Sequence, residues 1–471
     1  MQSISIITWF VNDIIVGPVF EVSLTILKQR NIVNLCMRIR SSFFLNIFLA
    51  GVLLSCNSNS RPAGTTSYNA DNLPAPNSTE SVTRFSKVVG WPDNKIPTAP
   101  AGFTVTRFAD KLDNPRWIYQ TPNGDILVAE AQTKLSGLKK LGASLHPRIK
   151  TQGYGNSADR ITLFRDANKD GVPEVRSIYA EKLNQPLGML VLGNHFYVAN
   201  TDGLVQYSYT AGELVMQGTG KKILDLPAGG YNNHWTRNII ANREGTKIYV
   251  SVGSGSNVGE NGMEHEVRRA NILEINPDGS GERIYASGLR NPVGMAWAPN
   301  TNTLWTVVNE RDELGDELVP DYLTGVQQGG FYGWPYSYFG QNEDPRWKDK
   351  QRADLVAKAL TPNVSLGSHT ASLGLAIYNH SSFPSRYHNG AFIGQHGSWN
   401  RSTISGYKVV FVPFKDGKPT GKPEDFLTGF IKDLNEREVY GRPVGILMLQ
   451  DGSILVADDT AGIIWRVAAN K

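Results

Sequence analysis

The sequence has little cysteine and little net charge, and each shortage excludes a class of protein. Among its 471 residues it has 2 cysteines, Cys36 and Cys56, so a disulfide-rich scaffold is excluded. The formal net charge is +4, and no dense run of lysine and arginine occurs outside the N-terminus. Because a nucleic-acid-binding surface needs clustered cations, we do not expect nucleic acid as a partner.

Glycine and proline, by contrast, are plentiful. The chain contains 47 glycines and 25 prolines, and 40% of its residues are hydrophobic. It can therefore bury a large core, while the frequent turn residues favour many short strands over long helices. These observations predict an all-β protein.

The N-terminus has the pattern of an export signal. Residues 37–56 read MRIRSSFFLNIFLAGVLLSC, in which two arginines precede an apolar run that ends at Cys56. This order is typical of a lipoprotein signal peptide, with a signal anchor as the alternative interpretation. We expect residues 1–36 to be upstream sequence outside the true start, residues 37–55 to be the signal peptide, and Cys56 to be the lipidated first residue of the mature protein.

A polar stretch follows this signal. Residues 57–81, NSNSRPAGTTSYNADNLPAPNSTES, contain no folding signal, so we expect residues 56–99 to be a lipid anchor and flexible tether. Cys36 would be absent from the mature chain, which leaves no disulfide. The protein would lie on the periplasmic or cell-surface side of a membrane, held by lipid and not by a transmembrane segment.

From about residue 100 one phrase recurs: a proline, an apolar strand, a turn of Asn, Asp or Gly, and a second apolar strand. Four clear copies and two imperfect ones occupy residues 112–131, 183–203, 289–310 and 441–462, then 229–257 and 371–400. Six such units predict a six-bladed β-propeller of four-stranded antiparallel blades over residues 100–471. Pairing of residues 103–109 with residues 462–468 would close it. Tandem immunoglobulin-like sandwiches are the alternative.

Polar residues recur where the innermost strands of such a propeller would begin. These strands line the central channel, so the loops entering them converge on one face. The residues at these stations are His234, Arg237, Arg116, Arg290, Asn291, His369 and Arg442. Several arginines around one channel indicate an anionic ligand, because guanidinium groups hold carboxylates well; a surface salt bridge is the alternative for each arginine alone.

Four segments also carry a family likeness. They are YASGLRNPVGMAW, VVNERDELGDELVPDYLTGVQQGGFYGWPYSYFG, HTASLGLAIY and GQHGSWNRSTISGYKVVFVPF. From about residue 100 to its end the chain resembles the soluble glucose/sorbosone dehydrogenase family, in particular its sorbosone-dehydrogenase-like branch. The resemblance implies a six-bladed propeller that uses pyrroloquinoline quinone (PQQ) and calcium to oxidise the aldehyde or hemiacetal carbon of a sugar. Electrons would pass to an external acceptor such as a quinone or a cytochrome.

The resemblance also implies roles for individual residues. His234 matches the general base, and an imidazole suits that task because its pKa lies near working pH. Arg290 and Asn291 match the catalytic pair against the quinone oxygens, where a fixed positive charge stabilises the developing anion. Further cofactor contacts are expected from Arg442 and, more weakly, from Arg237, Arg116 and Lys408. The match places the backbone carbonyls of Arg311 and Asp312, with Glu310 adjacent, on the cofactor calcium.

The chain departs from its glucose-oxidising relatives at three places. After the base histidine it has Trp-Thr-Arg-Asn in place of Gly-Gly-Arg-Leu, and Val293 stands in place of a glutamine. The lysine that clamps PQQ in those relatives has no counterpart, and we expect His396, Trp399 and Arg401 to compensate, with Trp399 as a wall beside the cofactor or sugar.

A second calcium loop is possible in DANKDGVPE, where Asp166, Asn168 and Asp170 alternate before Gly171. This spacing is the first half of a calcium-binding loop, but its twelfth position is Ser177 and not the usual glutamate. A hairpin turn without metal is the alternative.

Two other functions stay open from the sequence. One is a calcium-dependent hydrolase of sugar lactones, although such sites need several acidic side chains where this chain has mostly arginine and histidine. The other is a carbohydrate-binding propeller without chemistry. A bound quinone cofactor would distinguish the dehydrogenase from both.

Overall fold

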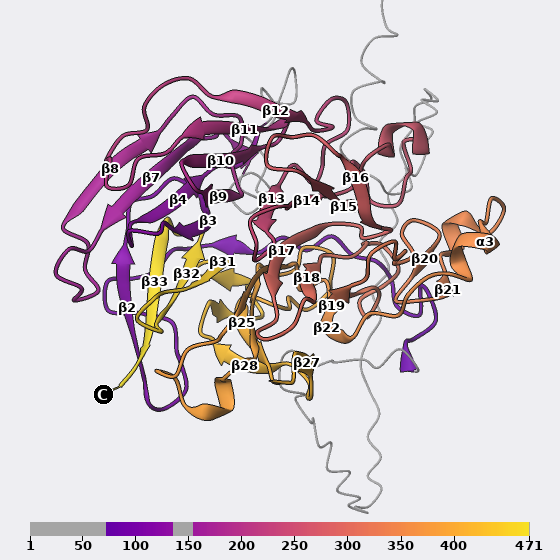
Figure 1. Cartoon of the computed structure of the whole chain (residues 1–471). Coiled ribbons are helices and arrows are strands. Elements are labelled where there is room, and N and C mark those ends of the chain that lie inside the picture. The colour runs from indigo at the N-terminus through magenta and orange to yellow at the C-terminus, as the bar shows by residue number, and fades with distance from the viewer. Residues whose placement is uncertain (1–71, 135–153, 471) are drawn as a thin grey trace, which may run out of the picture. The chain divides into compact units, whose positions relative to one another are not determined.

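A computed structural model describes residues 72–134 and 154–470, and it confirms the prediction of an all-β protein. The described strands form six four-stranded antiparallel sheets together with smaller ones (Figure 1). Neighbouring strands within each sheet follow one another along the chain for the most part, which is the arrangement that the repeated phrase predicts.

The six large sheets are as follows, each in its order of strands. The first two are β3 (Pro115–Gln120), β4 (Ile126–Glu130), β7 (Arg160–Arg165) and β8 (Val175–Ala180); and β9 (Met189–Leu192), β10 (His195–Asn200), β11 (Gly203–Ser208) and β12 (Lys221–Asp225). The next two are β13 (Arg237–Ala241), β14 (Ile248–Val252), β15 (Asn271–Ile275) and β16 (Arg283–Ser287); and β17 (Pro292–Trp297), β18 (Leu304–Val308), β19 (Pro320–Val326) and β22 (Val364–Ser368). The last two are β23 (Ser372–Ile377), β24 (Ala391–Gln395), β25 (Lys408–Val412) and β28 (Glu424–Leu427); and β31 (Pro443–Met448), β32 (Ile454–Asp458), β33 (Ile463–Ala469) and β2 (Phe103–Ala109).

Short elements decorate these sheets. They are β1 (Lys87–Val88) with β30 (Glu438–Val439) and β29 (Ile431–Asp433), the pairs β5 (Thr133–Lys134) with β6 (Tyr154–Gly155), β20 (Ser337–Tyr338) with β21 (Asn342–Glu343), and β26 (Phe414–Lys415) with β27 (Lys418–Pro419). Helical turns occur at η2 (Met263–Glu266), η3 (Pro345–Trp347), α3 (Ala353–Val356) and η4 (Ser385–Tyr387). No helix within the described ranges is long and apolar enough to cross a membrane.

The last sheet is completed by a strand from near the start of the described chain. Phe103 of β2 pairs with Ala469 of β33, and the antiparallel register continues along both strands. The predicted pairing of these two segments is therefore confirmed. It ties the two ends of the sheet-forming region together.

The first strands of the sheets pack against one another in sequence. β9 contacts β13, β13 contacts β17, β17 contacts β23, β23 contacts β31, and β31 contacts β3. The glycine of the repeated phrase makes this possible, because a Cβ at Gly374 of β23 would overlap the carbonyl oxygen of Val444 in β31. Between the sheets lie buried apolar clusters, one of which joins Trp117 of β3 to Phe196 of β10.

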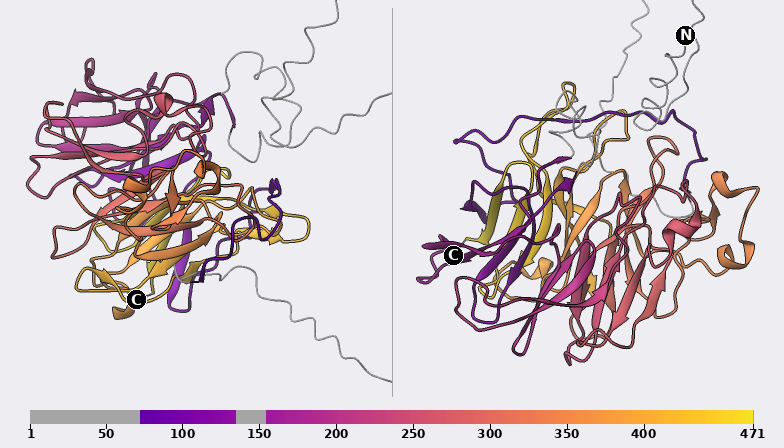
Figure 2. Two further views of the ribbon diagram at one scale, coloured as in Figure 1. Left: turned by 90° about the vertical axis from the view of Figure 1, so that its right-hand side faces the viewer. Right: turned by 90° about the horizontal axis from the view of Figure 1, so that it is seen from above.

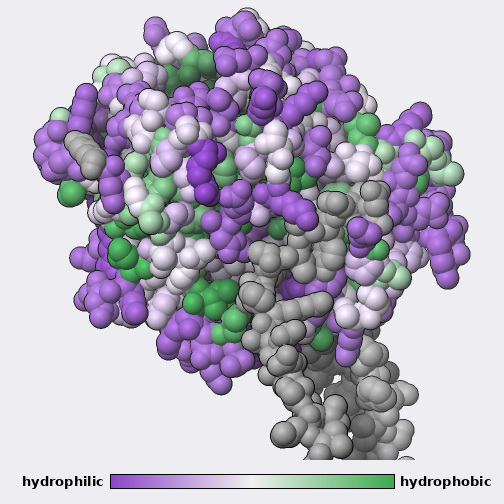
Figure 3. All heavy atoms as spheres, turned by 90° about the horizontal axis from the view of Figure 1, so that it is seen from below, coloured by the Kyte–Doolittle hydropathy of each residue, from purple (hydrophilic) through white to green (hydrophobic). Residues whose placement is uncertain are grey.

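The segment before the sheets differs from its prediction. The sequence predicts a flexible tether over residues 56–99, but the described part, residues 72–99, packs on the sheets and includes β1. Figure 2 shows this indigo segment running along the edges of several sheets. On the face shown in Figure 3, apolar side chains occur singly or in small groups among hydrophilic ones.

Candidate functional site

The polar residues singled out by the repeat lie where the first strands of the sheets begin. His234 and Arg237 lie at the start of β13, Arg290 and Asn291 directly before β17, and His369 shortly before β23. Arg442 directly precedes β31, and Arg116 is the second residue of β3. The sequence therefore locates these residues correctly, while their roles remain predictions.

His234 is held by the loop that follows β14. Its Nδ1 lies 2.9 Å from the backbone oxygen of Ser254 and 2.9 Å from its Oγ. A carbonyl oxygen only accepts hydrogen bonds, so Nδ1 donates and Nε2 keeps its lone pair. Burial, together with the charge of Arg290, lowers the pKa of His234 to about 3. The imidazole is therefore neutral near pH 7, as a proton acceptor must be.

Asn291 lies beside this histidine. A Cβ at Gly253 would overlap both the Oδ1 of Asn291 and the Cβ of His234, so the two side chains flank the same glycine. Asn291 is buried, and its Oδ1 has no hydrogen-bond partner among the described residues. A buried acceptor of this kind costs free energy until a donor meets it.

Arg290 is buried and clamps two loops together. Its Nε donates to the backbone oxygen of Asn257 at 3.0 Å, and its Nη1 donates to that of Glu310 at 2.6 Å. Its Nη2 donates to Oδ1 of Asn257 at 2.9 Å and lies 3.3 Å from Oδ2 of Asp312. The hydrogen bonds to protein oxygens fix the guanidinium of Arg290 in place. Its positive charge therefore stays near His234.

Residues 309–317, which we call the acidic loop, carry the predicted calcium ligands. Asp312 pairs with the buried His369, whose Nδ1 lies 3.2 Å from Oδ1 of Asp312 and whose Nε2 lies 2.8 Å from the backbone oxygen of Gly315. Although burial opposes ionisation, the bond from His369 and the charge of Arg290 lower the pKa of Asp312. The same partner raises the pKa of His369 against the effect of burial. Both shifts favour the charged forms, and both ring nitrogens of His369 face oxygen acceptors, as in an imidazolium.

The predicted calcium ligands, Glu310, Arg311 and Asp312, make hydrogen bonds within the protein. The Arg311 side chain donates to Oδ2 of Asp344 at 2.8 Å, and its Nε donates to the backbone oxygen of Asp312 at 2.9 Å. Burial raises the pKa of Glu310 to about 8, although Arg290 opposes this. Within residues 72–134 and 154–470, no three His, Cys, Asp or Glu side chains cluster as a metal site. Calcium held by backbone carbonyls stays a prediction.

A second charged group lies at the starts of β3 and β31. Asp459 accepts a hydrogen bond from Nη1 of Arg116 at 2.5 Å and lies 2.9 Å from Nε2 of His396. Arg442 donates from its Nε to the backbone oxygen of His396 at 2.8 Å. The guanidinium of Arg116 also lies over the ring of Trp235, 5.7 Å from its centroid. His396, followed by Arg116 and Arg442, keeps the pKa of Asp459 low against the effect of burial.

Arg237 holds the backbone at His234. Its Nη1 donates to the backbone oxygen of His234 at 2.7 Å, and its Nη2 donates to that of Pro227 at 2.7 Å. It is fully buried, and burial lowers its pKa to about 9. These hydrogen bonds make Arg237 a support of the His234 loop.

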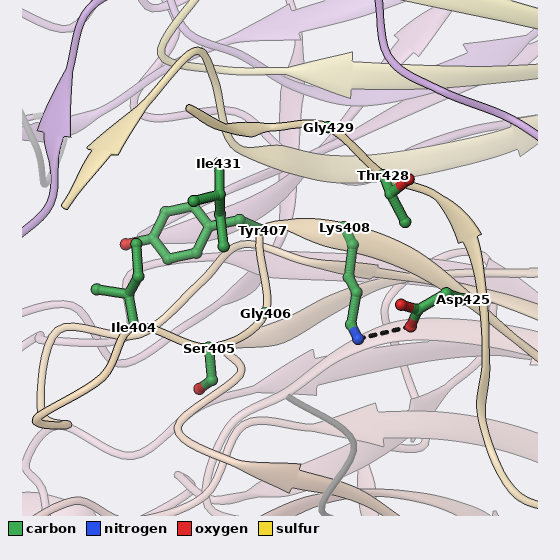
Figure 4. A pocket seen from close by; sticks show the side chains of 9 residues that line it. All are labelled: Ile404, Ser405, Gly406, Tyr407, Lys408, Asp425, Thr428, Gly429 and Ile431. Carbon is green, nitrogen blue, oxygen red and sulfur yellow. Dashed lines mark hydrogen bonds and ion pairs between the residues drawn. The ribbon is translucent and has the colours of Figure 1, made fainter. Parts of the chain in front are cut away.

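Three further residues, Lys408, Trp399 and Arg401, are expected from the sequence to contact the cofactor. Lys408 is in β25, separated from β23 by β24, and pairs with Asp425 at 2.5 Å beside a cavity of about 140 Å³ (Figure 4). Trp399 stacks on Phe85 with ring centroids 6.0 Å apart, and Arg401 pairs with Glu317 at 2.5 Å. Each of these contacts is with a residue other than His234, and Trp399 and Arg401 lie where the acidic loop meets neighbouring chain. Cofactor contacts from the three side chains stay a prediction.

The second calcium candidate lies in the exposed turn between β7 and β8. Asp166 accepts hydrogen bonds from the backbone N–H of Asp170 at 3.2 Å and of Gly171 at 2.7 Å, and Asn168 accepts one from Asp170 at 2.8 Å. These oxygens are thus turned toward their own backbone. Calcium binding here stays a prediction.

Sequence reasoning missed several residues that build the site. They are Ser254, Asn257, Asp321, Asp344 and Asp459. Asp321, for example, accepts the backbone N–H groups of Glu310 at 2.8 Å and Ser372 at 2.7 Å, which joins two sheets. Ser254, Asn257 and Asp459 all follow the second strand of a sheet, and that position was the available signal.

Comparison with known proteins places this geometry in a family. The family described as TrAA12-like matches residues 97–321 and 334–470. A protein of Borreliella burgdorferi is 31% identical over 312 residues, which cover 64% of this chain and 80% of that protein. The PQQ-dependent pyranose dehydrogenase of Coprinopsis cinerea is 24% identical over 428 residues, or 78% of this chain, and the match spans only about half, 54%, of that enzyme.

A solved structure confirms the fold. The calcium structure of a Trichoderma reesei enzyme of carbohydrate-active family AA12 superimposes with a TM-score of 0.63 at 17% identity, covering 83% of this chain and 100% of that one. The chain belongs to the TrAA12-like family.

Proposed function

We propose that the protein is a PQQ- and calcium-dependent dehydrogenase that oxidises a sugar, an aldose or a sorbosone-like aldehyde. Electrons would pass to an external acceptor such as a quinone or a cytochrome. Support comes from the TrAA12-like family and from the PQQ dependence of the Coprinopsis relative. The observation that carries the proposal is a neutral His234, fixed through Nδ1, beside the buried charge of Arg290.

We further propose that the six large sheets are the blades of a closed six-bladed β-propeller. The serial contacts of the first strands support this, as does the shared cluster between the sheets of β3 and β9. Such a ring would put the starts of all six first strands around one axis. The candidate residues would then surround a single channel.

The residues at these strand starts fit an anionic, planar quinone. Nε of Arg116 and Oδ1 of Asn291 are buried without partners among the described residues. Arg116 would hold a carboxylate of PQQ, and Asn291 would donate from Nδ2 to a quinone oxygen next to His234, which leaves its Oδ1 to accept from a bound hydroxyl. When bound, PQQ would supply the hydride acceptor.

Calcium fits the acidic loop. The carboxyl of Glu310 is buried in a setting that raises its pKa to about 8, so an adjacent divalent cation would stabilise its charged form. Carbonyl and carboxylate oxygens are the ligands that calcium prefers. The Arg311 and Asp312 carbonyls, with Glu310, would hold the ion.

His234 would take the proton from the sugar hydroxyl on Nε2 as hydride leaves the adjacent carbon. The bond from Nδ1 to Ser254 fixes the ring and stabilises the imidazolium that forms. Arg237 holds the backbone oxygen of His234 and so keeps the base in place. The charge of Arg290 stabilises negative charge that develops nearby. A bound anion would also raise the pKa of His234 and strengthen it as a base.

We also propose that the protein is exported and anchored through a lipid on Cys56. The signal that supports this, residues 37–56, lies outside the described residues. Radiolabelled fatty acid incorporated in wild type and not in Cys56→Ala would support the anchor. Equal incorporation in both would reject it.

Reconstitution tests the activity. Purified protein would be given PQQ and calcium, and dye reduction followed with a panel of aldoses, ketoaldoses and simple aldehydes. We expect turnover that needs both additions and falls by about 10²- to 10⁴-fold in His234→Gln. The matched control is His195→Gln, which removes an exposed histidine of β10. Lactone hydrolysis with calcium alone, or sugar binding without turnover, would reject the dehydrogenase in favour of the alternatives.

A further inference from the structure

The N-terminal segment makes a set of contacts that the family likeness does not cover. We call residues 77–91 the strap. The family match begins at residue 97, so the strap lies outside it. It runs from the acidic loop, past the turn at Trp399, to the last sheet, and Figure 2 shows it along the sheet edges.

The strap supplies hydrogen-bond partners to the backbone of the acidic loop. Oγ of Ser81 accepts the N–H of Gly315 at 2.8 Å, and Oγ1 of Thr79 accepts the N–H of Asp316 at 2.7 Å. In return, the N–H of Asn77 donates to the backbone oxygen of Leu314 at 2.8 Å. Three successive residues of the loop are therefore fixed by strap atoms.

A bridging side chain adds a fourth connection. Asn400, which is buried, donates from Nδ2 to the backbone oxygen of Val82 at 2.9 Å. Its Oδ1 accepts the N–H of Glu313 at 2.8 Å. The strap and the acidic loop thus share one amide group.

The loop is shaped for this contact. Gly315 has a φ of 101°, a conformation that other residues rarely adopt, and a Cβ there would lie 2.8 Å from the backbone oxygen of Thr79. A side chain at this position would push the strap away. The absence of a side chain at Gly315 therefore lets the strap lie against the acidic loop.

The strap is anchored at its far end. Nε1 of Trp91 donates to the buried carboxylate of Asp458 at 2.7 Å, and its ring stacks on Tyr440 with centroids 4.9 Å apart. Lys87 and Val88 form β1, which pairs in parallel with β30. Because these contacts fix the strap on the last sheet, its hydrogen bonds can restrict the motion of the acidic loop.

A short series of bonds connects the strap to the candidate site. Gly315, whose N–H is bound by Ser81, offers its own backbone oxygen to His369 at 2.8 Å. His369 pairs with Asp312, and Asp312 with Arg290 at 3.3 Å. Displacing Gly315 would therefore disturb the residue that sets the charge beside His234.

We propose that Thr79 and Ser81 are positioning residues, which hold the acidic loop in the conformation that the site requires. Without their hydroxyls the loop amides of Gly315 and Asp316 open more often, and the carbonyls of Arg311 and Asp312 hold calcium less well. The second consequence rests on the proposed function, and the first does not.

The test compares matched substitutions in the full-length protein. Thr79→Val and Ser81→Ala each remove one of the two acceptors, and Thr79→Ser keeps the hydroxyl at position 79. Thr83→Val and Ser78→Ala are the controls, because the side chains of Thr83 and Ser78 make no hydrogen bond to any residue that the structure describes. Amide hydrogen exchange would be measured for residues 311–318, with residues 248–252 of β14 as an internal reference.

We expect exchange in residues 311–318 to be about tenfold faster in Thr79→Val and Ser81→Ala, with β14 unchanged and both controls like wild type. Thr79→Ser should keep the protection of wild type. The calcium concentration for half-maximal dye reduction should rise severalfold in the same two variants. Unchanged loop exchange would overturn the proposal, and so would faster exchange with an unaltered calcium requirement. If wild type itself reduces no dye, the proposed function fails, while loop exchange still decides whether the strap positions the loop.

Discussion

Two acidic loops of similar composition have opposite environments in this protein. In the turn of residues 166–174, Asn168 and Asp170 are exposed, and their oxygens accept the backbone N–H groups of the same turn. In the acidic loop of residues 309–317, Glu310 and Arg311 are buried, and Asp312 pairs with Arg290 and His369, which precede β17 and β23. The spacing of acidic residues in the sequence therefore does not identify a functional site. The residues that their side chains contact do. One loop stabilises itself, and the other holds the candidate site together.

The largest effect should come from Asp312→Asn. Removing this carboxylate leaves Arg290 and His369 buried without their counter-ion, which should lower the free energy of unfolding by about 3 kcal/mol. Asp170→Asn, in the exposed turn, should cost no more than about 0.5 kcal/mol. Denaturant unfolding of the two variants beside wild type measures both. Equal costs would show that the two loops do not differ as described.

The next comparison is between the stability costs of replacing two asparagines, Asn257 beside the acidic loop and Asn168 in the exposed turn. Asn257 accepts the N–H of Asp312 at 3.0 Å through Oδ1 and also binds Arg290, so Asn257→Ala should cost about 2 kcal/mol. Asn168→Ala, whose partners lie within its own exposed turn, should cost well under half of that. Thermal and denaturant unfolding would be compared for the pair. An Asn168→Ala cost as large as that of Asn257→Ala would contradict the contrast.

The fold could be predicted further than the site. The proline–strand–turn–strand phrase located the first strands, because each strand start is a local signal that the chain repeats. It placed His234, Arg290 and Arg442 at equivalent positions. The contacts of Lys408 with Asp425 and of Trp399 with Phe85 could not be predicted, since no local pattern specifies them.

The strap illustrates the same limit. Its composition resembles a linker, and its order comes from single hydroxyls such as those of Thr79 and Ser81 and from Trp91, which fits a site in the last sheet. A polar, proline-rich segment of this kind has no periodicity to reveal a partner. Asn257 and Asp459 were missed because their importance comes from cations far away in the sequence.

A smaller effect should appear in the pH dependence of stability. His234 in the folded protein has a pKa of about 3, below its ordinary value of 6.5, so the unfolded chain binds the proton first as the pH falls. His234 should therefore contribute stability that is complete above pH 6.5 and is lost progressively from pH 6.5 toward pH 3. In His234→Gln, the fall in unfolding free energy between pH 7 and pH 5 should be smaller by about 2 kcal/mol.

Denaturant titrations at pH 7 and pH 5 would measure this difference. The exposed His265, changed to Gln, serves as the control because it should follow wild type at both values. A pH slope that is the same in all three proteins would mean that the environment of His234 does not lower its pKa.

The most direct test of the central claim is the reduction of bound PQQ by a sugar in a single turnover. Protein loaded with PQQ and calcium would be mixed with the best sugar of the panel without oxygen or dye, and the absorbance of the bound cofactor followed. We predict binding in wild type and in His234→Gln alike, with reduction about 10²- to 10⁴-fold slower in the variant. Reduction at the same rate in both, or no binding of PQQ by wild type, would contradict the account.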